Sequence, residues 1–178
     1  MKAIETKYNG YRFRSRLEAR WAVFFDELGI EYQYEPEGYN LGSIGWYLPD
    51  FYLPSLEIYC EAKGPEPTHE EMVKCIKIQE GMNQKCVILR DIPNLYGKTK
   101  FSNLILKFTE EKWHDYKAET CLFNICEECG HLGLFSLDYS WREYSFCPIC
   151  GKASEYNGGI EDAYDKARQA RFEHGEHP

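Results

Sequence analysis

The chain has no long hydrophobic run. Every apolar stretch is far shorter than the roughly 18 residues that a membrane-spanning helix requires. The first 16 residues also lack the apolar segment of a secretory signal peptide. We therefore expect a soluble, cytoplasmic protein that does not associate with membranes.

Positive charge is scarce as well. The 178 residues carry 21 Lys and Arg against 29 Asp and Glu, a net charge of −8, which argues against a general nucleic-acid coat protein. Residues 1–25, however, hold six cations and only two anions, while the rest of the chain carries −12. The arginines of this segment form either a local basic footprint for phosphates or ordinary solvated surface charge. They are Arg12, Arg14, Arg16 and Arg20.

Hydrophobic residues are plentiful enough for a folded core. They make up 43% of the chain, and 16% of the residues are aromatic, which excludes an intrinsically disordered protein. The length suits one domain with a small appendage.

The order of the expected elements indicates a mixed α/β core. Apolar residues recur at helical spacing from Ser15 to Leu28, and Gly29 provides the stop. A second helix begins at a capping box formed by Thr68 and Glu71. With the strand-like runs, the order is α-β-β-β-α-β. The expected strands span residues 30–35, 46–53, 57–63 and 85–90, the second helix ends near residue 81, and residues 101–108 are either strand or helix.

A carboxylate pair with a lysine beside it is the main candidate for catalysis. Glu61 and Lys63 lie two apart on an apolar, β-prone run, so both side chains point to the same face of a strand. Asp50 follows Pro49 eleven residues before Glu61, a distance that one β-hairpin spans. Two carboxylates beside a lysine can hold Mg²⁺ and position a water, as phosphodiester hydrolysis requires.

The Glu-x-Lys triplet alone decides little. Only the copy at 61–63 ends a strand-like run, is followed by Gly64-Pro65 and has a Pro-Asp pair upstream. An exposed strand edge with paired charges remains the alternative for this copy. An acid, any residue and a lysine occur four times, at residues 5–7, 61–63, 110–112 and 115–117.

Glu18 is open to two interpretations. Ser15 and Glu18 have the spacing of a capping box, in which the carboxylate accepts a hydrogen bond from the Ser15 amide. Glu18 also lies next to the apolar stripe of its helix, and a carboxylate turned partly inward needs a partner, which a metal ion would provide.

Four of the eight cysteines form two C-x₂-C pairs, each followed by glycine, with 17 residues between the pairs. This spacing predicts a tetrahedral Zn²⁺ site in which Gly130 and Gly151 allow the tight turns. A disulfide framework is disfavoured without a secretory signal, and a thioredoxin-like redox pair needs one such motif at a helix start. The expected ligands are Cys126, Cys129, Cys147 and Cys150.

The charge of this cysteine module argues against contact with phosphates. Residues 121–152 carry two cations and four anions, and four thiolates on one Zn²⁺ add a further −2. Electrostatics therefore favour a structural role, or a surface through which the chain forms a homodimer or docks a protein partner. Stacking of the module's aromatic residues on bases is the alternative.

A helix Glu, a Pro-Asp pair and Glu-x-Lys in this element order together resemble the PD-(D/E)XK nuclease superfamily, whose fold is restriction-endonuclease-like. Residues 11–21 and 47–51 are similar to small phage-encoded members, to phage junction resolvases of the endonuclease I type and to transposon-end endonucleases. The resemblance covers about residues 8–92, half of the chain.

The resemblance implies a role for each of four residues. Asp50 and Glu61 would bind Mg²⁺ or Mn²⁺, Lys63 would orient or activate the water, and Glu18 would complete or add a metal site. The four arginines would hold flanking phosphates, which is affinity without sequence preference. The expected units are a nuclease-like domain at residues 1–115, a zinc-ribbon module at 116–156 and a helical C-terminal tail at 157–178.

The expected function is therefore that of a Mg²⁺-dependent endonuclease that hydrolyses DNA with a metal-activated water, and RNA is not excluded as a substrate. A non-catalytic module that binds nucleic acid or protein through the zinc ribbon is the first alternative. A thiol redox protein is the second, and it predicts reactive C-x-x-C thiols and no bound zinc.

Overall fold

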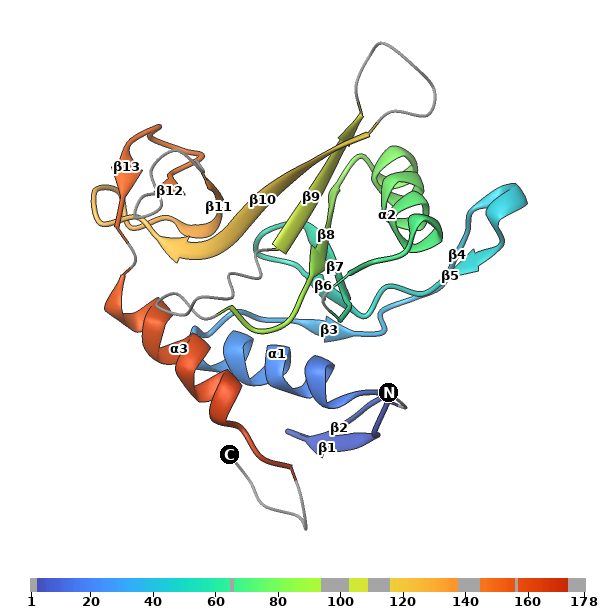
Figure 1. Ribbon diagram of the computed structural model, residues 1–178, viewed down its shortest axis with the longest axis horizontal. Coiled ribbons are helices and arrows are strands. Elements are labelled where there is room, and N and C mark those ends of the chain that lie inside the picture. The colour runs from blue at the N-terminus through green and yellow to red at the C-terminus, as the bar shows by residue number, and fades with distance from the viewer. Residues whose placement is uncertain are drawn as a thin grey trace.

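A mixed nine-stranded sheet forms the centre of the computed structural model (Figure 1). Its strands are β3 (Gln33–Tyr34), β6 (Phe51–Leu53), β7 (Ile58–Ala62), β8 (Lys85–Leu89), β9 (Asn103–Phe108), β10 (Tyr116–Ile125), β11 (Leu132–Leu137), β12 (Ser145–Phe146) and β13 (Ala153–Ser154). They are arranged in the order β13-β12-β11-β10-β9-β8-β7-β6-β3. Only β7 and β8 are parallel neighbours within this sheet. The structure describes residues 3–64, 66–93, 103–108, 116–137, 145–155 and 157–172.

Two short antiparallel ribbons lie outside this sheet. One pairs β1 (Thr6–Tyr8) with β2 (Tyr11–Phe13). The other pairs β4 (Tyr39–Asn40) with β5 (Trp46–Tyr47), and the 3₁₀ turn η1 (Gly42–Ile44) connects its strands. The β4–β5 ribbon projects from one end of the molecule (Figure 1). Neither ribbon is predicted as a separate element by the sequence.

Three α-helices of the described part of the chain cover the sheet. Helices α1 (Arg16–Glu27) and α3 (Gly158–Gln169) lie side by side, and α2 (His69–Met82) belongs to a separate buried cluster (Figure 1). No helix in the described part of the chain is long and apolar enough to cross a membrane. The mixed α/β architecture expected from the sequence is confirmed at this level, and the restriction-endonuclease-like core stays a prediction.

Alternation along β7 assigns the two faces of the sheet. Ile58, Cys60 and Ala62 pack in the cluster that contains α1, whereas Tyr59 packs in the cluster that contains α2. Successive side chains of a strand point to opposite faces, so Glu61 shares the α2 face with Tyr59. The period-two pattern of one strand thus brings a carboxylate to the α2 side of the sheet.

Helix α1 begins and ends where the sequence predicts. The Ser15 hydroxyl caps its first turn by accepting from the Glu18 amide at 3.2 Å, and Gly29 follows its end with φ of 64°. Trp21, Phe24 and Phe25 are fully buried. Burial of such side chains stabilises by about 1.5–3 kcal/mol each, which fixes this helix on the sheet.

The C-terminal helix is part of the core. The ring of Tyr164 stacks on Phe24 of α1 with centroids 4.4 Å apart, and its hydroxyl accepts from the Phe123 amide of β10 at 3.1 Å. Ile160, Ala163 and Ala167 are buried beside it. Helix α3 lies within the segment expected as a helical tail, residues 157–178, of which residues 173–178 lie outside the described part. Its apolar face packs on the first helix.

The remaining expected elements are found with shorter bounds. The capping box of Thr68 and Glu71 begins α2, and residues 103–108 form a strand. The predicted strand over residues 46–53 is divided into β5 and β6 by Pro49 and Asp50. The division into units 1–115, 116–156 and 157–178 stays a prediction, although strands β10 to β13 continue the sheet of the first expected unit.

Candidate functional site

One cavity brings the four predicted catalytic residues together. It has a volume of about 450 Å³ and lies between the start of α1, the β4–β5 ribbon, the end of β7 and the start of α2. Glu18, Asp50 and Glu61 are all buried, with 6%, 3% and 7% of their surface exposed. The lining residues are Arg14, Glu18, Trp46, Tyr47, Leu48, Asp50, Glu61, Lys63, Glu71 and Lys74.

Asp50 is held by one backbone donor and one cation. Its Oδ2 accepts from the Ala62 amide of β7 at 2.7 Å, and its Oδ1 pairs with Arg14 Nη2 at 2.8 Å. The Pro49-Asp50 pair interrupts the predicted strand just before β6, which leaves the carboxylate free to turn toward β7. The expected meeting of Asp50 with the Glu61 strand is found.

Glu61 and Lys63 form an ion pair inside the cavity. Lys63 Nζ lies 2.9 Å from Glu61 Oε1 and 3.4 Å from Glu71 Oε1 of α2. The hydroxyl of Tyr47 donates to Glu61 Oε2 at 2.7 Å. Burial acts to lower the pKa of Lys63, but the charges of Glu61, Asp50 and Glu71 outweigh it and raise the pKa above the ordinary value. These carboxylates therefore favour the protonated form of Lys63.

Glu18 receives three hydrogen bonds. Its Oε1 accepts from the Ser15 hydroxyl at 2.6 Å, and its Oε2 accepts from the Arg14 amide at 3.0 Å and the Tyr34 hydroxyl at 2.7 Å. The Ser15 amide is not among these donors, so the predicted capping box is only half formed. A carboxylate has about four acceptor positions, and Arg14, Ser15 and Tyr34 already use three of those on Glu18.

The three carboxylates raise the cost of negative charge in the cavity. Burial, with the neighbouring charges of Glu61 and Glu18, raises the pKa of Asp50 to about 8, although the Ala62 amide and Lys63 oppose this shift. A carboxyl that resists ionisation in this way gains from any cation placed beside it. The donor set is also one of hard oxygen ligands, which Mg²⁺ and Mn²⁺ prefer.

The carboxylate oxygens of the cavity, however, are not close enough to one another to surround a cation. Within the described residues, only the cysteine cluster offers three or more ligand atoms that all lie within 4.8 Å of one another. In the carboxylate cavity, Arg14 and Lys63 supply positive charge in direct contact with Asp50 and Glu61. A metal ion would have to take over one oxygen of each carboxylate from these side chains.

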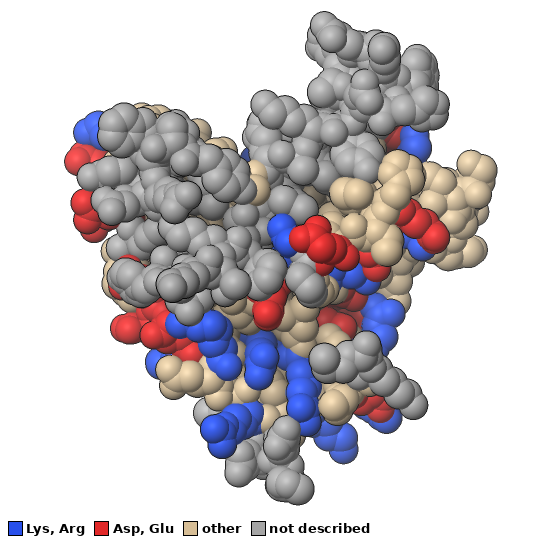
Figure 2. Space-filling model, viewed as in Figure 1, with Lys and Arg blue, Asp and Glu red and all other residues tan. Residues whose placement is uncertain are grey.

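The four predicted phosphate-binding arginines are found in three places. Arg12 is exposed and pairs with Glu5, away from the cavity. Arg14 lies in the carboxylate cavity. Arg16 and Arg20 line a second cavity of about 270 Å³ together with Arg171, which follows α3. Figure 2 shows Lys and Arg side chains grouped over the lower part of one face of the molecule.

The four cysteines are arranged for a metal. The sulfur atoms of Cys126 and Cys150 lie 3.6 Å apart, and those of Cys129 and Cys147 lie 3.7 Å apart. Tetrahedral Zn²⁺ with Zn–S bonds of about 2.3 Å separates its sulfur ligands by about 3.8 Å. The cluster can therefore hold a zinc ion.

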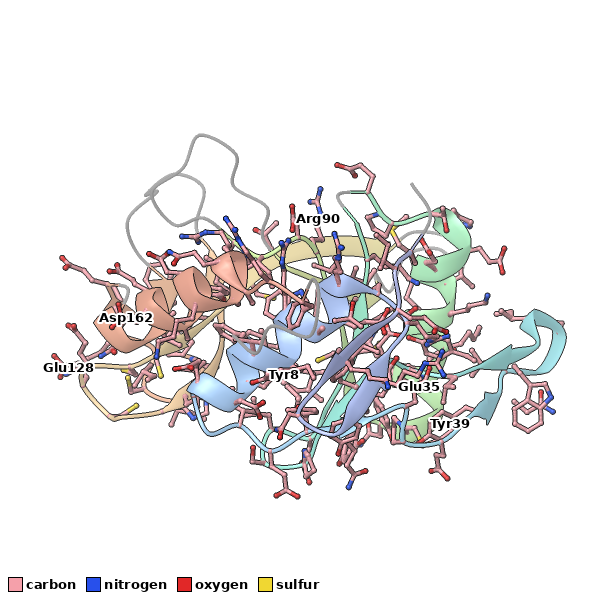
Figure 3. All side chains as sticks on the ribbon, turned by 90° about the horizontal axis from the view of Figure 1, so that it is seen from below. Tyr8, Glu35, Tyr39, Arg90, Glu128 and Asp162 are labelled. Carbon is pink, nitrogen blue, oxygen red and sulfur yellow. The ribbon has the colours of Figure 1, made fainter. Side chains whose placement is uncertain are left out.

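Both turns of this centre depend on glycine. Gly130 and Gly151 have φ of 71° and 69°, in the left-handed region that the sequence assigns to them. Each donates its amide to the first cysteine carbonyl of its pair, at 2.8 and 3.0 Å. Glu128, within the first pair, and Glu35, the ion-pair partner of Arg14, lie toward opposite ends of the molecule (Figure 3). The cysteine centre is thus remote from the carboxylate cavity.

Two residues that support the site carry no motif in the sequence: Tyr47 donates to Glu61, and Tyr34 donates to Glu18. Glu71 is expected from the sequence only as a helix cap, but its Oε1 also lies 3.4 Å from Lys63 Nζ. Arg171 joins two arginines from more than 150 positions earlier only because α3 packs on α1.

Comparisons with known proteins add no relative. No protein-family model, no curated protein and no solved structure matches the chain. The function therefore has to be inferred from the geometry of these residues.

Proposed function

We propose that the protein is a metal-dependent endonuclease of the PD-(D/E)XK type that hydrolyses DNA phosphodiester bonds with Mg²⁺ or Mn²⁺. The observation that carries this proposal is the convergence of Glu18, Asp50, Glu61 and Lys63 in one cavity. These residues come from a helix start, a loop and a strand end, so no local pattern forces them together. Three buried carboxylates beside one lysine have a cost in stability that a catalytic role explains.

Asp50 and Glu61 are the residues that would hold the cation. One oxygen of each carboxylate accepts a hydrogen bond from a fixed donor. The Ala62 amide donates to Asp50, and the Tyr47 hydroxyl donates to Glu61. The other oxygen contacts only the end of a long cationic side chain, and such a contact can be exchanged. A divalent cation bound there would lower the pKa of a coordinated water and offset charge on the phosphate. Glu18, with three acceptor positions already used, orients the helix start beside this pair.

Lys63 and Arg14 would bind the phosphate oxygens. When Asp50 and Glu61 turn to a cation, Arg14 and Lys63 each lose one of two carboxylate partners, and a phosphate oxygen can take the position that is vacated. A phosphodiester supplies two anionic oxygens, and a protonated lysine stabilises the charge that develops there. Arg14 keeps an ion pair with Glu35 at 2.6 Å, which limits how far it moves.

The choice of a nucleic acid as substrate is supported by the second cavity. Arg16, Arg20 and Arg171 converge there. Guanidinium groups bind phosphate oxygens through paired, charge-assisted hydrogen bonds, and a nucleic-acid strand provides a series of phosphates. We infer that this cavity holds a phosphate that flanks the cleavage site.

For the cysteine centre we propose a structural Zn²⁺. Among the described residues, the buried cluster at that end of the sheet consists of Phe135, Cys126 and Cys147, so two of its three members are expected zinc ligands. A zinc ion bound by four thiolates would contribute folding free energy to this part of the chain.

The proposal is tested by incubating the purified protein with supercoiled plasmid and Mg²⁺. We expect nicked or linear product, and no product when divalent cations are omitted. Lys63→Ala should lower the cleavage rate by about 10²–10³-fold, the usual cost of removing one group that stabilises transition-state charge. Lys152→Ala is the matched control, because Lys152 pairs with Glu128 at the cysteine centre and does not line the carboxylate cavity.

Undiminished cutting by Lys63→Ala would refute the site assignment. Absence of cutting with Mg²⁺ and with Mn²⁺, while the protein still binds nucleic acid or another protein through its cysteine end, would favour the non-catalytic module.

A further inference from the structure

Trp46 is the most exposed of the large hydrophobic side chains in the described part of the chain, with 73% of its surface accessible. Burial of an aromatic side chain stabilises the folded state by about 1.5–3 kcal/mol, and the exposed Trp46 does not contribute this stabilisation. The neighbouring Tyr47 is buried and donates to Glu61. Since neighbours on a strand point to opposite sides, the contact that positions the catalytic carboxylate also turns Trp46 outward.

The indole ring of Trp46 lies close to Gly38. A Cβ atom added to Gly38 would be in van der Waals contact with the ring, 3.5 Å from Trp46 Cε3. The β4–β5 ribbon that carries Trp46 projects beyond the sheet at one end of the molecule (Figures 1 and 3). A flat aromatic ring that is mostly exposed is a suitable surface for another planar group.

Trp46 also stands between two cavities. It lines the carboxylate cavity of about 450 Å³ and the adjacent cavity of about 530 Å³ between the β4–β5 ribbon and α2. The first cavity offers the cations Arg14, Lys63 and Lys74, which suit a phosphate. Along a nucleic-acid strand each phosphate is followed by a base, so a phosphate held in the cavity places a base near its rim.

We propose that Trp46 is a stacking platform for one unpaired base beside the phosphate that is cut. This inference rests on the proposed nuclease function and names its substrate class. A base inside a duplex is already stacked on both sides and offers no face to a tryptophan. The substrate is therefore a strand with an unstacked nucleotide at the cleavage site, as in an overhang, a flap, a branch or a single strand. The platform itself is indifferent to base identity, because every base has a π-face.

The test measures binding separately from cutting. A fluorescent duplex with an unpaired overhang is titrated with the full-length protein in Ca²⁺, which takes the same oxygen ligands as Mg²⁺. One abasic nucleotide is then moved stepwise through the overhang. We expect wild-type affinity to fall roughly 5- to 150-fold at one position, the range for loss of one stacked base. Trp46→Ala should bind the abasic and intact strands equally, and Trp46→Phe should restore part of the difference.

Ile149→Ala is the matched control. Ile149 is 69% exposed, close to the value for Trp46, but it lies in the cysteine centre. This variant should discriminate the abasic strand as the wild type does. Circular dichroism of each variant checks that the fold is retained.

Two results would overturn the inference and leave the nuclease proposal standing. The first is that Trp46→Ala still discriminates the abasic strand. The second is that Trp46→Ala changes the oligomeric state of the protein in solution, which would show that the ring contacts a second copy of the chain. If the wild type neither binds nor cuts any nucleic acid, the nuclease proposal fails together with the inference.

Discussion

At the scale of single residues, the carboxylates of the cavity differ in how much of their acceptor capacity is already used. Glu18 accepts three hydrogen bonds from the start of its own helix and from Tyr34. Asp50 and Glu61 each have one fixed donor and one cationic partner. A cation that enters the cavity meets the least resistance from the last two.

We therefore expect Glu18→Gln to lower the cleavage rate much less than Asp50→Asn or Glu61→Gln. Asp50→Asn and Glu61→Gln should each lower the plasmid cleavage rate by about 10²-fold or more, since each removes a proposed metal ligand. Glu18→Gln should cost less than 10-fold in rate and about 1 kcal/mol in unfolding free energy, through the weakened helix start. Cleavage rates with Mg²⁺ and urea unfolding of the three variants measure both effects. Equal rate losses in all three would make Glu18 a full ligand.

Asp50 also has a consequence for stability. The pKa of Asp50 is about 8 in the folded chain, because of burial and the neighbouring Glu61 and Glu18, and it is near 3.9 when unfolded. The folded state thus binds more protons between pH 4 and 8, and stability falls as pH rises through this window. Without divalent cations, Asp50→Asn should be more stable than wild type at pH 8.5 by about 1 kcal/mol or more, because one pKa unit corresponds to about 1.4 kcal/mol.

Thermal unfolding from pH 5 to 8.5 measures this difference. The stability advantage of Asp50→Asn should shrink toward pH 5. It should reverse in sign when Mg²⁺ is added, because the cation stabilises only the wild type. Asp162→Asn, on the exposed side of α3, is the control and should show neither effect. A less stable Asp50→Asn at pH 8.5 would mean that the ion pair with Arg14 outweighs the burial.

At the scale of elements, the sequence predicts what depends on local patterns. The helix from Ser15 and the capping box at Thr68 are found as expected, because caps and apolar periodicity are local. The pairing of Glu61 with Lys63 follows from strand alternation in the same way. The two β-ribbons and the placement of Tyr34, Tyr47 and Glu71 depend on contacts between distant segments, and no spacing in the chain encodes them.

The cysteine centre gives an element-scale prediction. Strands β11 to β13 are short or end at its turns, and its buried cluster contains two of the four cysteines. We expect one Zn²⁺ per chain by elemental analysis. Cys126→Ser, or a zinc chelator, should abolish hydrogen-exchange protection in β11 to β13 but leave that of β7 and β8 intact. Uniform loss of protection would show that the whole sheet unfolds as one unit, and full protection without zinc would exclude a structural metal.

At the scale of the whole molecule, the packing of α3 on α1 unites the two ends of the chain at one surface. The stacked pair of Phe24 and Tyr164 fixes this arrangement, and Lys166 of α3 pairs with Glu27 of α1. Arg171 is thereby placed with Arg16 and Arg20. Residues from both ends of the chain thus form a cavity lined by three arginines, although the chain as a whole has a net charge of −8.

This arrangement predicts that a residue near the C-terminus contributes to nucleic-acid binding. Each phosphate contact adds about 0.9 to the slope of log affinity against log salt for duplex DNA, and about 0.7 for a single strand. Arg171→Gln should therefore lower that slope by about one such contact and weaken binding at low salt without changing base preference. Lys152→Gln is the control, because Lys152 pairs with Glu128 at the cysteine centre and does not line this cavity. Binding titrations of an oligonucleotide between 50 and 200 mM salt would measure the slopes. An unchanged slope for Arg171→Gln would exclude the cavity of Arg16, Arg20 and Arg171 from the interface and confine phosphate binding to Arg14 and Lys63.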